Sequence, residues 1–415
     1  MTGVADLAID PALVERYVAD LARHGAVGAT GVSRPVYGRA WAAAQRQVAG
    51  WCEEAGLAVR QDAAGNLWAR LEGTEPGGGS IVSGSHVDSQ VPGGRFDGAL
   101  GVIAAVIAAR TLHRRWGRPR RTIEVLSLCD EEASRFSSNF WGSRAILGRI
   151  RPDELDSLRD RSGVTVADAM REAGLAPERI ASCVRHDIDT FLELHIEQGP
   201  VLEEAGLPVG VVHAITGLRH CLVELNGRTD HAGARPMSSR RDAMAGAAEI
   251  VSRVIEYARA AGAPAVTTVG QMEVEPNLVA AVPGRVRFSI DGRHPDPDAL
   301  RRMWEHHLSV IAEVARERDL EPTWTVALDA APSPCDPGLV RLLGDTASEL
   351  GIPFRVMHSG AGHDSQHMAS IAKVAMIFVR SIGGVSHTPA ELTRVEDAVL
   401  GIRLLTAALG RLAYG

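Results

Sequence analysis

The sequence predicts an α/β fold in which a central mixed sheet flanked by helices is interrupted by a smaller α+β domain. Three observations lead to this prediction. The 415 residues exceed the roughly 250 to 300 at which single cores stop growing, so two domains are expected. Short apolar strands alternate with helical stretches near both ends of the chain, which is typical of α/β proteins. From about Ile215 onward the pattern of elements changes.

The N-terminal part alternates between helical and strand-like segments. Apolar residues recur at helical spacing in residues 11–22 and 36–55, so two helices are expected to open the chain. A hairpin is expected around the turn-forming residues 63–66, between strands at 57–61 and 67–71. A buried strand, a helix and another strand are predicted next, at residues 80–87, 99–112 and 122–128.

The middle of the chain predicts two helices on a four-stranded sheet. The helices are expected at 240–261 and 297–318, and the strands at 220–225, 266–272, 285–291 and 323–328. After a proline-rich link, a helix at 338–350 and a strand at 374–379 resume the first pattern. We therefore expect one domain from residues 1–213 and 330–415 and a second from residues 214–329.

The composition argues against several classes of protein. Net charge is −7 and only one short basic run occurs, at residues 114–121, so no nucleic-acid partner is expected. No segment has the apolar length of a membrane helix, and residues 1–10 do not resemble a targeting signal. The lack of such a segment also means that no membrane partner is expected. The five cysteines are far apart and lack CxxC pairing, which favours a reducing, cytoplasmic location.

Residues 80–98 contain the strongest local signal for a functional site. His86 ends an expected strand, at the edge of the sheet where α/β proteins bind their ligands. Asp88 points the same way and is placed to accept the other imidazole N–H, which would fix the tautomer of His86. Asp97 follows a Gly-Gly turn that would return its carboxylate toward His86. A polar loop over a strand end would explain His86 alone equally well.

Three further segments add side chains of the same kind. Glu131 and Glu132 follow the strand at 122–128, where one could bind a metal and the other act as a general base, although acidic clusters are usually solvated loops. His195 lies in an alternating segment, and His387 follows a Gly-Gly pair after the last strand. Together these imidazoles and carboxylates form the N/O donor set that Zn²⁺ favours.

The motifs around these residues resemble one family of dinuclear-metal amidohydrolases. This family includes N-carbamoyl-L-amino acid hydrolases, allantoate amidohydrolases and β-ureidopropionases, within the aminoacylase and carboxypeptidase-like superfamily. The resemblance runs from about Gly84 to the C-terminus in the family's order. It rests on residues 84–88 (Gly-Ser-His-Val-Asp), 94–98 (Gly-Arg-Phe-Asp-Gly), 131–136 (Glu-Glu-Ala-Ser-Arg-Phe), 195–200 (His-Ile-Glu-Gln-Gly-Pro) and 386–389 (Ser-His-Thr-Pro).

The resemblance implies two divalent metal ions in each subunit, with Zn²⁺ expected and Mn²⁺ or Co²⁺ as alternatives. Asp97 would bridge the two ions, with His86 and His195 completing one site and Glu132 and His387 the other. Glu131 would then be the general base. One departure is Ala133, where relatives often have glycine and where alanine constrains the backbone beside Glu132.

The resemblance also implies residues that bind the substrate. Gln198 would contact a ureido group, Asn277 and Arg293 would grip a carboxylate, and Gly362 with His363 would shape the pocket. Residues 214–329 would be a lid and dimerisation domain. In the implied homodimer, His231 of this domain would stabilise the oxyanion in the neighbouring active site.

We therefore expect hydrolysis of the ureido C–N bond of an N-carbamoyl-L-amino acid to the amino acid, CO₂ and NH₃. Allantoate amidohydrolase or ureidopropionase activity is the first alternative, because residues 140–143 and 356–360 look like allantoate amidohydrolases. A metallo-exopeptidase or aminoacylase with the same metal chemistry is a further alternative. A binding protein on an inactive hydrolase scaffold ranks last, because every expected ligand is present.

Overall fold

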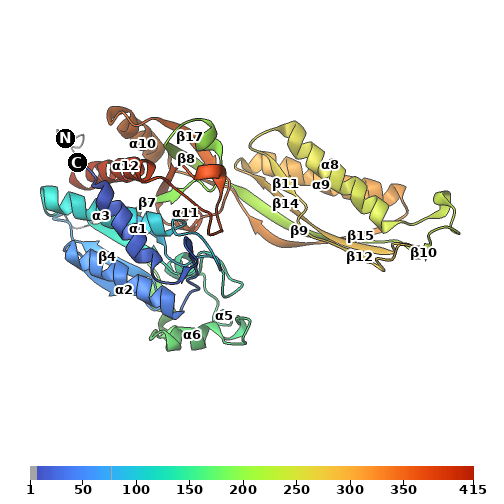
Figure 1. The fold of residues 1–415 in the computed structure, drawn as a ribbon, viewed down its shortest axis with the longest axis horizontal. Helices are drawn as coiled ribbons and strands as arrows, with labels where there is room; N and C mark the ends of the chain where they lie inside the picture. The colour runs from blue at the N-terminus through green and yellow to red at the C-terminus, as the bar shows by residue number, and fades with distance from the viewer. Residues whose placement is uncertain (1–6, 76) are drawn as a thin grey trace. The chain divides into compact units, whose positions relative to one another are not determined.

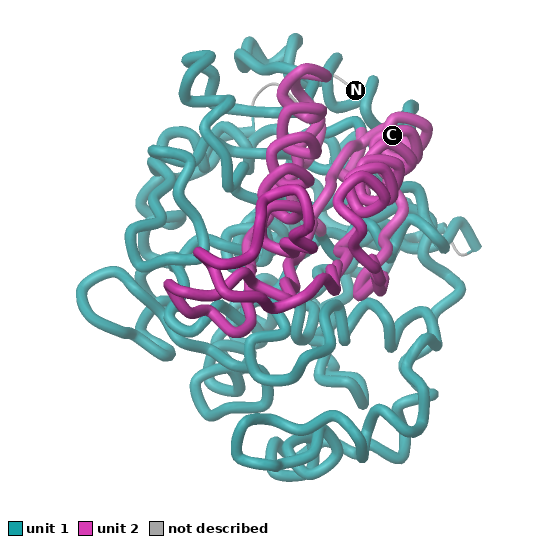
Figure 2. Tube along the Cα trace, turned by 90° about the vertical axis from the view of Figure 1, so that its right-hand side faces the viewer, with its two compact units in different colours: residues 1–213, 335–357, 363–415 teal, residues 214–334, 358–362 magenta. Residues whose placement is uncertain are grey.

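A computed structural model describes residues 7–75 and 77–415. The chain folds into two compact units, coloured separately in Figure 2. The first comprises the described residues up to His213 together with Cys335–Met357 and His363–Gly415. The second comprises Ala214–Pro334 and His358–Gly362. The chain thus leaves the first unit twice and returns to it twice.

Most strands of a nine-stranded mixed sheet lie in the first unit, and the predicted α/β class is confirmed. The strand order is β16-β8-β18-β7-β5-β6-β4-β3, and β17 also pairs with β8. β5 runs parallel to β6 and β7, and β18 runs parallel to β7. The strands are β3 (Ala58–Gln61), β4 (Leu67–Leu71), β5 (Ser80–His86), β6 (Ile123–Leu128), β7 (Ile188–Ile196), β8 (Val209–Ile215), β16 (Ser333–Pro334), β17 (Phe354–Ser359) and β18 (Lys373–Val379).

Helices cover both faces of this sheet (Figure 1). On one face Gly401 of α12 is close to Leu194 of β7, and α3 packs beside α12. On the other face Phe191, three residues earlier in β7, lies in a core cluster with Ile146 of α4 and Met368 of α11. An odd separation along a strand puts two side chains on opposite faces, which agrees with this arrangement. The helices are α1 (Pro11–Ala22), α2 (Arg39–Glu54), α3 (Ala99–Trp116), α4 (Trp141–Ile146), α10 (Pro337–Glu349), α11 (Asp364–Met368) and α12 (Val395–Tyr414).

Several helices begin at an aspartate that caps the first turn. In each, the carboxylate accepts a hydrogen bond from a backbone N–H that has no partner within the helix. In three of them a proline follows, and its fixed φ suits the first helical position. These N-cap residues are Asp10 of α1, Asp242 of α8 (Ala243–Ala261), Asp296 of α9 (Pro297–Glu317) and Asp336 of α10. α2 differs, because it begins at Arg39 after Gly38 rather than at the predicted residue 36.

The second unit has α8 and α9 side by side on one face of a five-stranded sheet (Figure 1). The strand order is β11-β14-β9-β15, and β12 also pairs with β14. Its core includes Val223, Val286, Ile250 and Trp304. The strands are β9 (Gly217–Asn226), β11 (Val266–Thr268), β12 (Met272–Glu275), β14 (Arg285–His294) and β15 (Glu321–Ala330), and the short β10 (Asp230–His231) pairs with β13 (Ala281–Val282).

The predicted strand at residues 266–272 is wrong as one continuous strand. Thr268 pairs with Asp291, and Met272 pairs with Phe288. Three residues separate Thr268 from Met272, but only two residues separate their partners on β14. The extra residue is a bulge, which breaks the ladder at residues 269–271 and divides the strand into β11 and β12. Both segments lie along β14, so the expected four-stranded sheet has its outer strand split in two.

All five cysteines are free and buried. Within residues 7–75 and 77–415, none of the helices combines the length and the apolar character needed to cross a membrane. The segment from 141 to 183 contains short helices that were not predicted, including α5 (Glu154–Ser157) and α6 (Val166–Glu172). Helices of fewer than eight residues show too few turns for a 3.6-residue period to be recognised.

The buried His307 of α9 makes the stability of the second unit depend on pH. Its Nε2 lies 3.0 Å from Thr267 Oγ1, and burial, followed by the nearby His306, lowers the pKa of His307 to about 4. Between this value and the unfolded pKa of about 6.5 only the unfolded state binds the proton, so acid favours unfolding.

We expect the free energy of unfolding to fall by about 2 kcal/mol between pH 7 and pH 5 because of His307 alone. Replacing His307→Leu should reduce this pH dependence, even if the lost packing lowers stability at pH 7. Urea unfolding at several pH values measures both effects. An identical slope in the variant and the wild type would contradict the assignment.

Candidate metal centre

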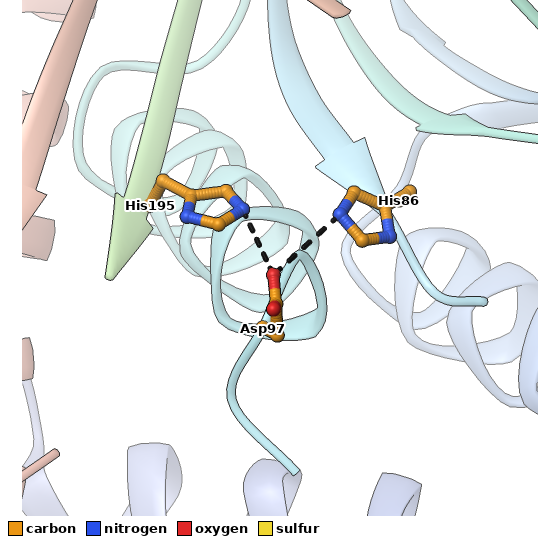
Figure 3. Close-up of side chains that lie close together, drawn as sticks. All are labelled: His86, Asp97 and His195. Carbon is orange, nitrogen blue, oxygen red and sulfur yellow. Dashed lines mark ion pairs between the residues drawn. The ribbon is translucent and has the colours of Figure 1, made fainter. Parts of the chain in front are cut away.

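Two neighbouring parallel strands bring the first candidate ligands together. β5 ends at His86, and β7, which pairs with it, carries His195. Asp97 precedes α3, which packs against both strands. Figure 3 shows the two imidazoles and the carboxylate of Asp97 pointing toward one another. Residues far apart in the sequence thus meet at one edge of the sheet, where α/β proteins place their sites.

Asp97 lies between two groups of possible ligands. Its Oδ1 is 3.2 Å from His195 Nε2 and 3.8 Å from His86 Nε2. Its Oδ2 is 3.4 Å from His387 Nε2, which is 3.6 Å from Glu132 Oε2. In each group, His86–Asp97–His195 and Asp97–Glu132–His387, the ligand atoms lie within 4.8 Å of one another. The five residues predicted as ligands are therefore brought together, with Asp97 in both groups.

These separations and donor atoms fit divalent metal ions. Ligands about 2.0 to 2.1 Å from a tetrahedral ion lie about 3.3 Å apart, close to the distances around Asp97. The Nδ1 of His195 is 2.9 Å from the carbonyl oxygen of Ile196, and that of His86 is 3.1 Å from the carbonyl oxygen of Asp88. A carbonyl only accepts hydrogen bonds, so Nδ1 carries a proton, and Nε2, which faces Asp97, is the nitrogen left to bind an ion.

Asp88 positions this centre in a way that differs in detail from the expectation. Its backbone carbonyl, rather than its carboxylate, makes the closer contact with His86, because Oδ1 lies 3.7 Å from Nδ1. The carboxylate accepts a hydrogen bond from the backbone N–H of Glu132 at 3.1 Å instead. Asp88 thus connects the loop after β5 with the loop after β6, which carries Glu131 and Glu132.

The centre concentrates negative charge that cations would offset. Burial, followed by neighbouring carboxylates, raises the pKa of Glu131, Glu132 and Asp130 well above the ordinary range. Burial acts in the same direction on Asp97, but His195, His86 and His387 together outweigh it and the pKa of Asp97 is lowered. Burial opposes protonation of His195, yet Asp97 raises its pKa to about 9. Divalent ions bound at this centre would supply positive charge and so offset the negative charge of the buried carboxylates.

A third group of possible ligands consists of Glu193, His195 and His363. The oxygens of Glu193 accept hydrogen bonds from the hydroxyls of Ser85 and Ser365, at 2.7 and 2.6 Å. This carboxylate is therefore satisfied by the protein itself. His363 packs edge-on against His195, with ring centroids 4.6 Å apart, so the structure places it beside the candidate ligands.

Gln198 and Glu131 also lie at the centre. Gln198 donates from Nε2 to Asp97 Oδ2 at 2.9 Å, while its Oε1 is buried without a hydrogen-bond partner among the described residues. Glu131 Oε2 is 3.9 Å from His86 Nε2. Ala133 has a φ of +51°, a left-handed conformation that glycine adopts more readily, and this explains the constraint expected beside Glu132.

The remaining predicted residues belong to the second unit. His231 is exposed, and its Nδ1 accepts hydrogen bonds from the backbone N–H groups of Gly233 and Ala234. Arg293 pairs with Asp291 at 2.8 Å and donates to the carbonyl of Gly360 at 3.3 Å, two residues before Gly362. Asn277 is exposed, with a φ of +54°.

Glu391 is a residue of the centre that the sequence did not reveal. Its Oε1 accepts hydrogen bonds from the backbone N–H groups of Phe96 and Asp97, each at 2.9 Å. Its Oε2 accepts from the hydroxyl of Ser386 at 2.8 Å, and that hydroxyl lies 3.0 Å from Asp97 Oδ2. Glu391 thus holds the loop of Asp97 against the loop of His387. No local pattern indicates this role, because the contact spans 294 residues.

Gln90 was also missed, and its amide donates to Glu132 Oε2 at 2.7 Å. A signal existed here, because Gln90 follows His86 and Asp88 in the loop at the edge of the sheet.

An α/β sheet with a buried cluster of histidines and carboxylates at its strand ends is the architecture of a metal-dependent hydrolase. The pattern of the family described as "Peptidase family M20/M25/M40" matches residues 82–411, and the chain belongs to this family. The resemblance inferred from the motifs is therefore confirmed.

Relatives narrow the type of reaction. The chain is 42% identical to N-carbamoyl-L-amino acid amidohydrolase of Geobacillus stearothermophilus, over 89% of this chain and 90% of that protein. It is 39% identical to allantoate amidohydrolase of Escherichia coli (strain K12), over 97% of this chain and 98% of that protein. An amidase of the hydantoinase/carbamoylase family from Burkholderia multivorans has a similar structure, with a TM-score of 0.92, 32% identity and 99% coverage of both chains. The protein is a hydrolase of C–N bonds other than peptide bonds.

Removal of the Glu391 carboxylate should weaken metal binding without removing a ligand. In Glu391→Ala the N–H of Asp97 loses its acceptor, and we expect metal affinity to fall by about 10- to 100-fold, as for other residues that orient ligands. In Glu391→Gln one oxygen can still accept from both N–H groups, so affinity should stay within a few-fold of wild type. Competitive titration against a chelator measures these affinities. Equal losses in the two variants would contradict the positioning role.

Proposed function

We propose that the chain is a dinuclear-metal amidohydrolase that hydrolyses the ureido C–N bond of an N-carbamoyl-L-amino acid. The products would be the amino acid, CO₂ and NH₃. The observation that carries the proposal is the pair of ligand groups that share Asp97, with Glu131 beside them. A relative named for this reaction aligns over 89% of the chain.

His86, Asp97 and His195 would hold one divalent ion, and Asp97, Glu132 and His387 the other. The nitrogen and oxygen donors favour Zn²⁺, although Mn²⁺ and Co²⁺ accept the same donor types. When bound, two such ions polarise a carbonyl group and lower the pKa of a water molecule.

Glu131 would move the proton during hydrolysis. Its carboxylate takes a proton from the attacking water as the water oxygen bonds to the ureido carbon. The same proton is then given to the leaving nitrogen as the C–N bond breaks and ammonia departs. The remaining N-carboxy amino acid loses CO₂ to give the free amine.

Gln198 supports a ureido substrate over a simple amide. Its buried Oε1 has no hydrogen-bond partner among the described residues, and such an acceptor costs free energy until a donor reaches it. The terminal NH₂ of a ureido group can supply this donor. A peptide has no second nitrogen on the scissile carbonyl, so it leaves this acceptor unsatisfied.

We propose that residues 214–329 form a lid and dimerisation domain. Because two N–H groups donate to Nδ1 of His231, the proton of the neutral ring resides on Nε2, where it can donate to an oxyanion in a neighbouring subunit. Arg293 and Asn277 would bind the substrate carboxylate, and Gly362 and His363 would shape the pocket.

The proposed partner is a second copy of the chain. β15 is an edge strand of ten residues and is exposed over most of its length. Its exposed side chains include Trp324, Val326 and Leu328. An exposed apolar edge strand can pair with another chain, and it promotes aggregation when it is left uncovered.

The predicted cytoplasmic location also stays a proposal.

Allantoate is the second candidate substrate, because the relative named for its hydrolysis aligns over 97% of the chain. Allantoate also combines ureido and carboxylate groups, so the same residues would bind it.

A panel of N-carbamoyl-L-amino acids, allantoate, ureidopropionate and dipeptides, scored by ammonia and amine release, separates these substrates. We expect the highest kcat/KM for an N-carbamoyl-L-amino acid. A higher value for allantoate would favour the alternative, and cleavage of dipeptides alone would overturn the proposal.

Replacing Glu131→Gln should keep the metal ions and lower kcat by about 10²- to 10⁴-fold, the usual contribution of a general base. The amide is nearly the same size but does not accept the proton. Metal content and kcat are measured on the same preparations, with the exposed Glu53→Gln as a control. If kcat remained near the wild-type value while metal stayed bound, Glu131 would not be the base.

A further inference from the structure

A second concave site lies in the first unit beside the candidate metal centre. It has a volume of about 900 Å³ and is lined by the start of α2, the loop after β5 and residues 134–135, 160–162 and 172–173. None of the five candidate ligands lines it, nor does Glu131. The metal chemistry therefore does not account for this cavity.

The cavity is rich in positive charge. Four arginines line it, and among the residues that the structure describes only Arg135 of these four has an acidic partner, Asp160 at 3.0 Å. Arg39, Arg46 and Arg161 are exposed, and their side chains make no hydrogen bond or ion pair within the described part of the chain. Apart from the paired Asp160, the one acidic side chain in the lining is Glu172. In a chain of net charge −7, unpaired arginines gathered in one cavity indicate an anion site.

Directional donors surround the same space. Gly38 precedes α2 and offers no side chain to its first turn, and that turn contains no acidic residue. The first N–H groups of a helix lack acceptors within the helix and favour an anion. The hydroxyl of Ser134, in the lining, is buried without a hydrogen-bond partner among the described residues. These donors can bind the oxygens of an anion while the arginines neutralise its charge.

We propose that this cavity binds a small polyanion with at least two oxyanion groups, either phosphates or carboxylates. Three unpaired guanidinium groups and one carboxylate leave two positive charges, which a dianion would balance. The volume is within the usual range of about 300 to 1,000 Å³ for small-molecule pockets and exceeds what one inorganic anion needs. This site is separate from the substrate site of the proposed function.

The position of the cavity links its occupant to catalysis. Gln90 lines the cavity and donates to Glu132 Oε2 at 2.7 Å. Ser134 and Arg135 follow Glu132 by two and three residues. A bound anion would therefore contact the two segments that hold Glu132, and its binding would change turnover at the metal centre.

The binding test uses the full-length, metal-loaded protein and isothermal titration calorimetry with two probes, fructose 1,6-bisphosphate and succinate. The test variant is Arg39→Gln with Arg46→Gln, and the matched control is Arg114→Gln with Arg115→Gln, two exposed arginines on α3. We expect one probe to bind the wild type and the control equally and the test variant about tenfold or more weakly. The preferred probe distinguishes phosphate from carboxylate ligands.

Two results would overturn the anion site. One is the absence of binding of both probes up to millimolar concentrations, and the other is equal binding by the test and control variants.

The link to catalysis is tested by the kinetics of hydrolysis with the bound probe. We expect kcat or KM to change in the wild type and the control but not in the test variant. If the probe bound the arginines and left both constants unchanged, the link through Gln90 would be wrong.

Discussion

The carboxylate of Asp97 is the group around which the first unit is organised. It is buried, it faces three imidazoles, and it lies in both groups of possible metal ligands. Burial of a carboxylate costs free energy unless cations or hydrogen-bond donors compensate its charge. The backbone of Asp97 is held by Glu391, and its side chain is contacted by Gln198 and Ser386. The loops of the centre are thus tied to one another as well as to the sheet.

The sheet makes this arrangement possible because its central strands are parallel. β5, β6 and β7 end at one edge, where they or the loops that follow them carry His86, Glu131 and His195. Hydrogen bonds from the imidazole Nδ1 atoms to backbone carbonyls direct the Nε2 atoms toward Asp97. The fold thus sets the positions of the donor atoms and the orientation of the two rings.

The sequence predicted about half of the regular elements, namely those whose signals are local, and it did not predict α12, β8 or β17. β5, β6 and β18 are short apolar runs, and the start of α1 is marked by Asp10 and Pro11. The division between β11 and β12 was not predicted, because the bulge is a property of their pairing with β14 rather than of their own residues. The five candidate ligands were found because they follow strand ends in motifs. Glu391 was not, because its role depends on contacts with a loop almost 300 residues earlier in the chain.

The tie between Asp97 and Glu391 has a consequence for biosynthesis. Asp97 emerges from the ribosome early, whereas His387, Glu391 and the central strand β18 lie within the last 43 residues of the chain. A nascent chain that lacks this segment has neither the complete sheet nor the acceptor that holds Asp97. The centre therefore forms only after residues 373–391 have been synthesised, and a chain that ends before Lys373 would lack the candidate ligand His387 as well as the last helix.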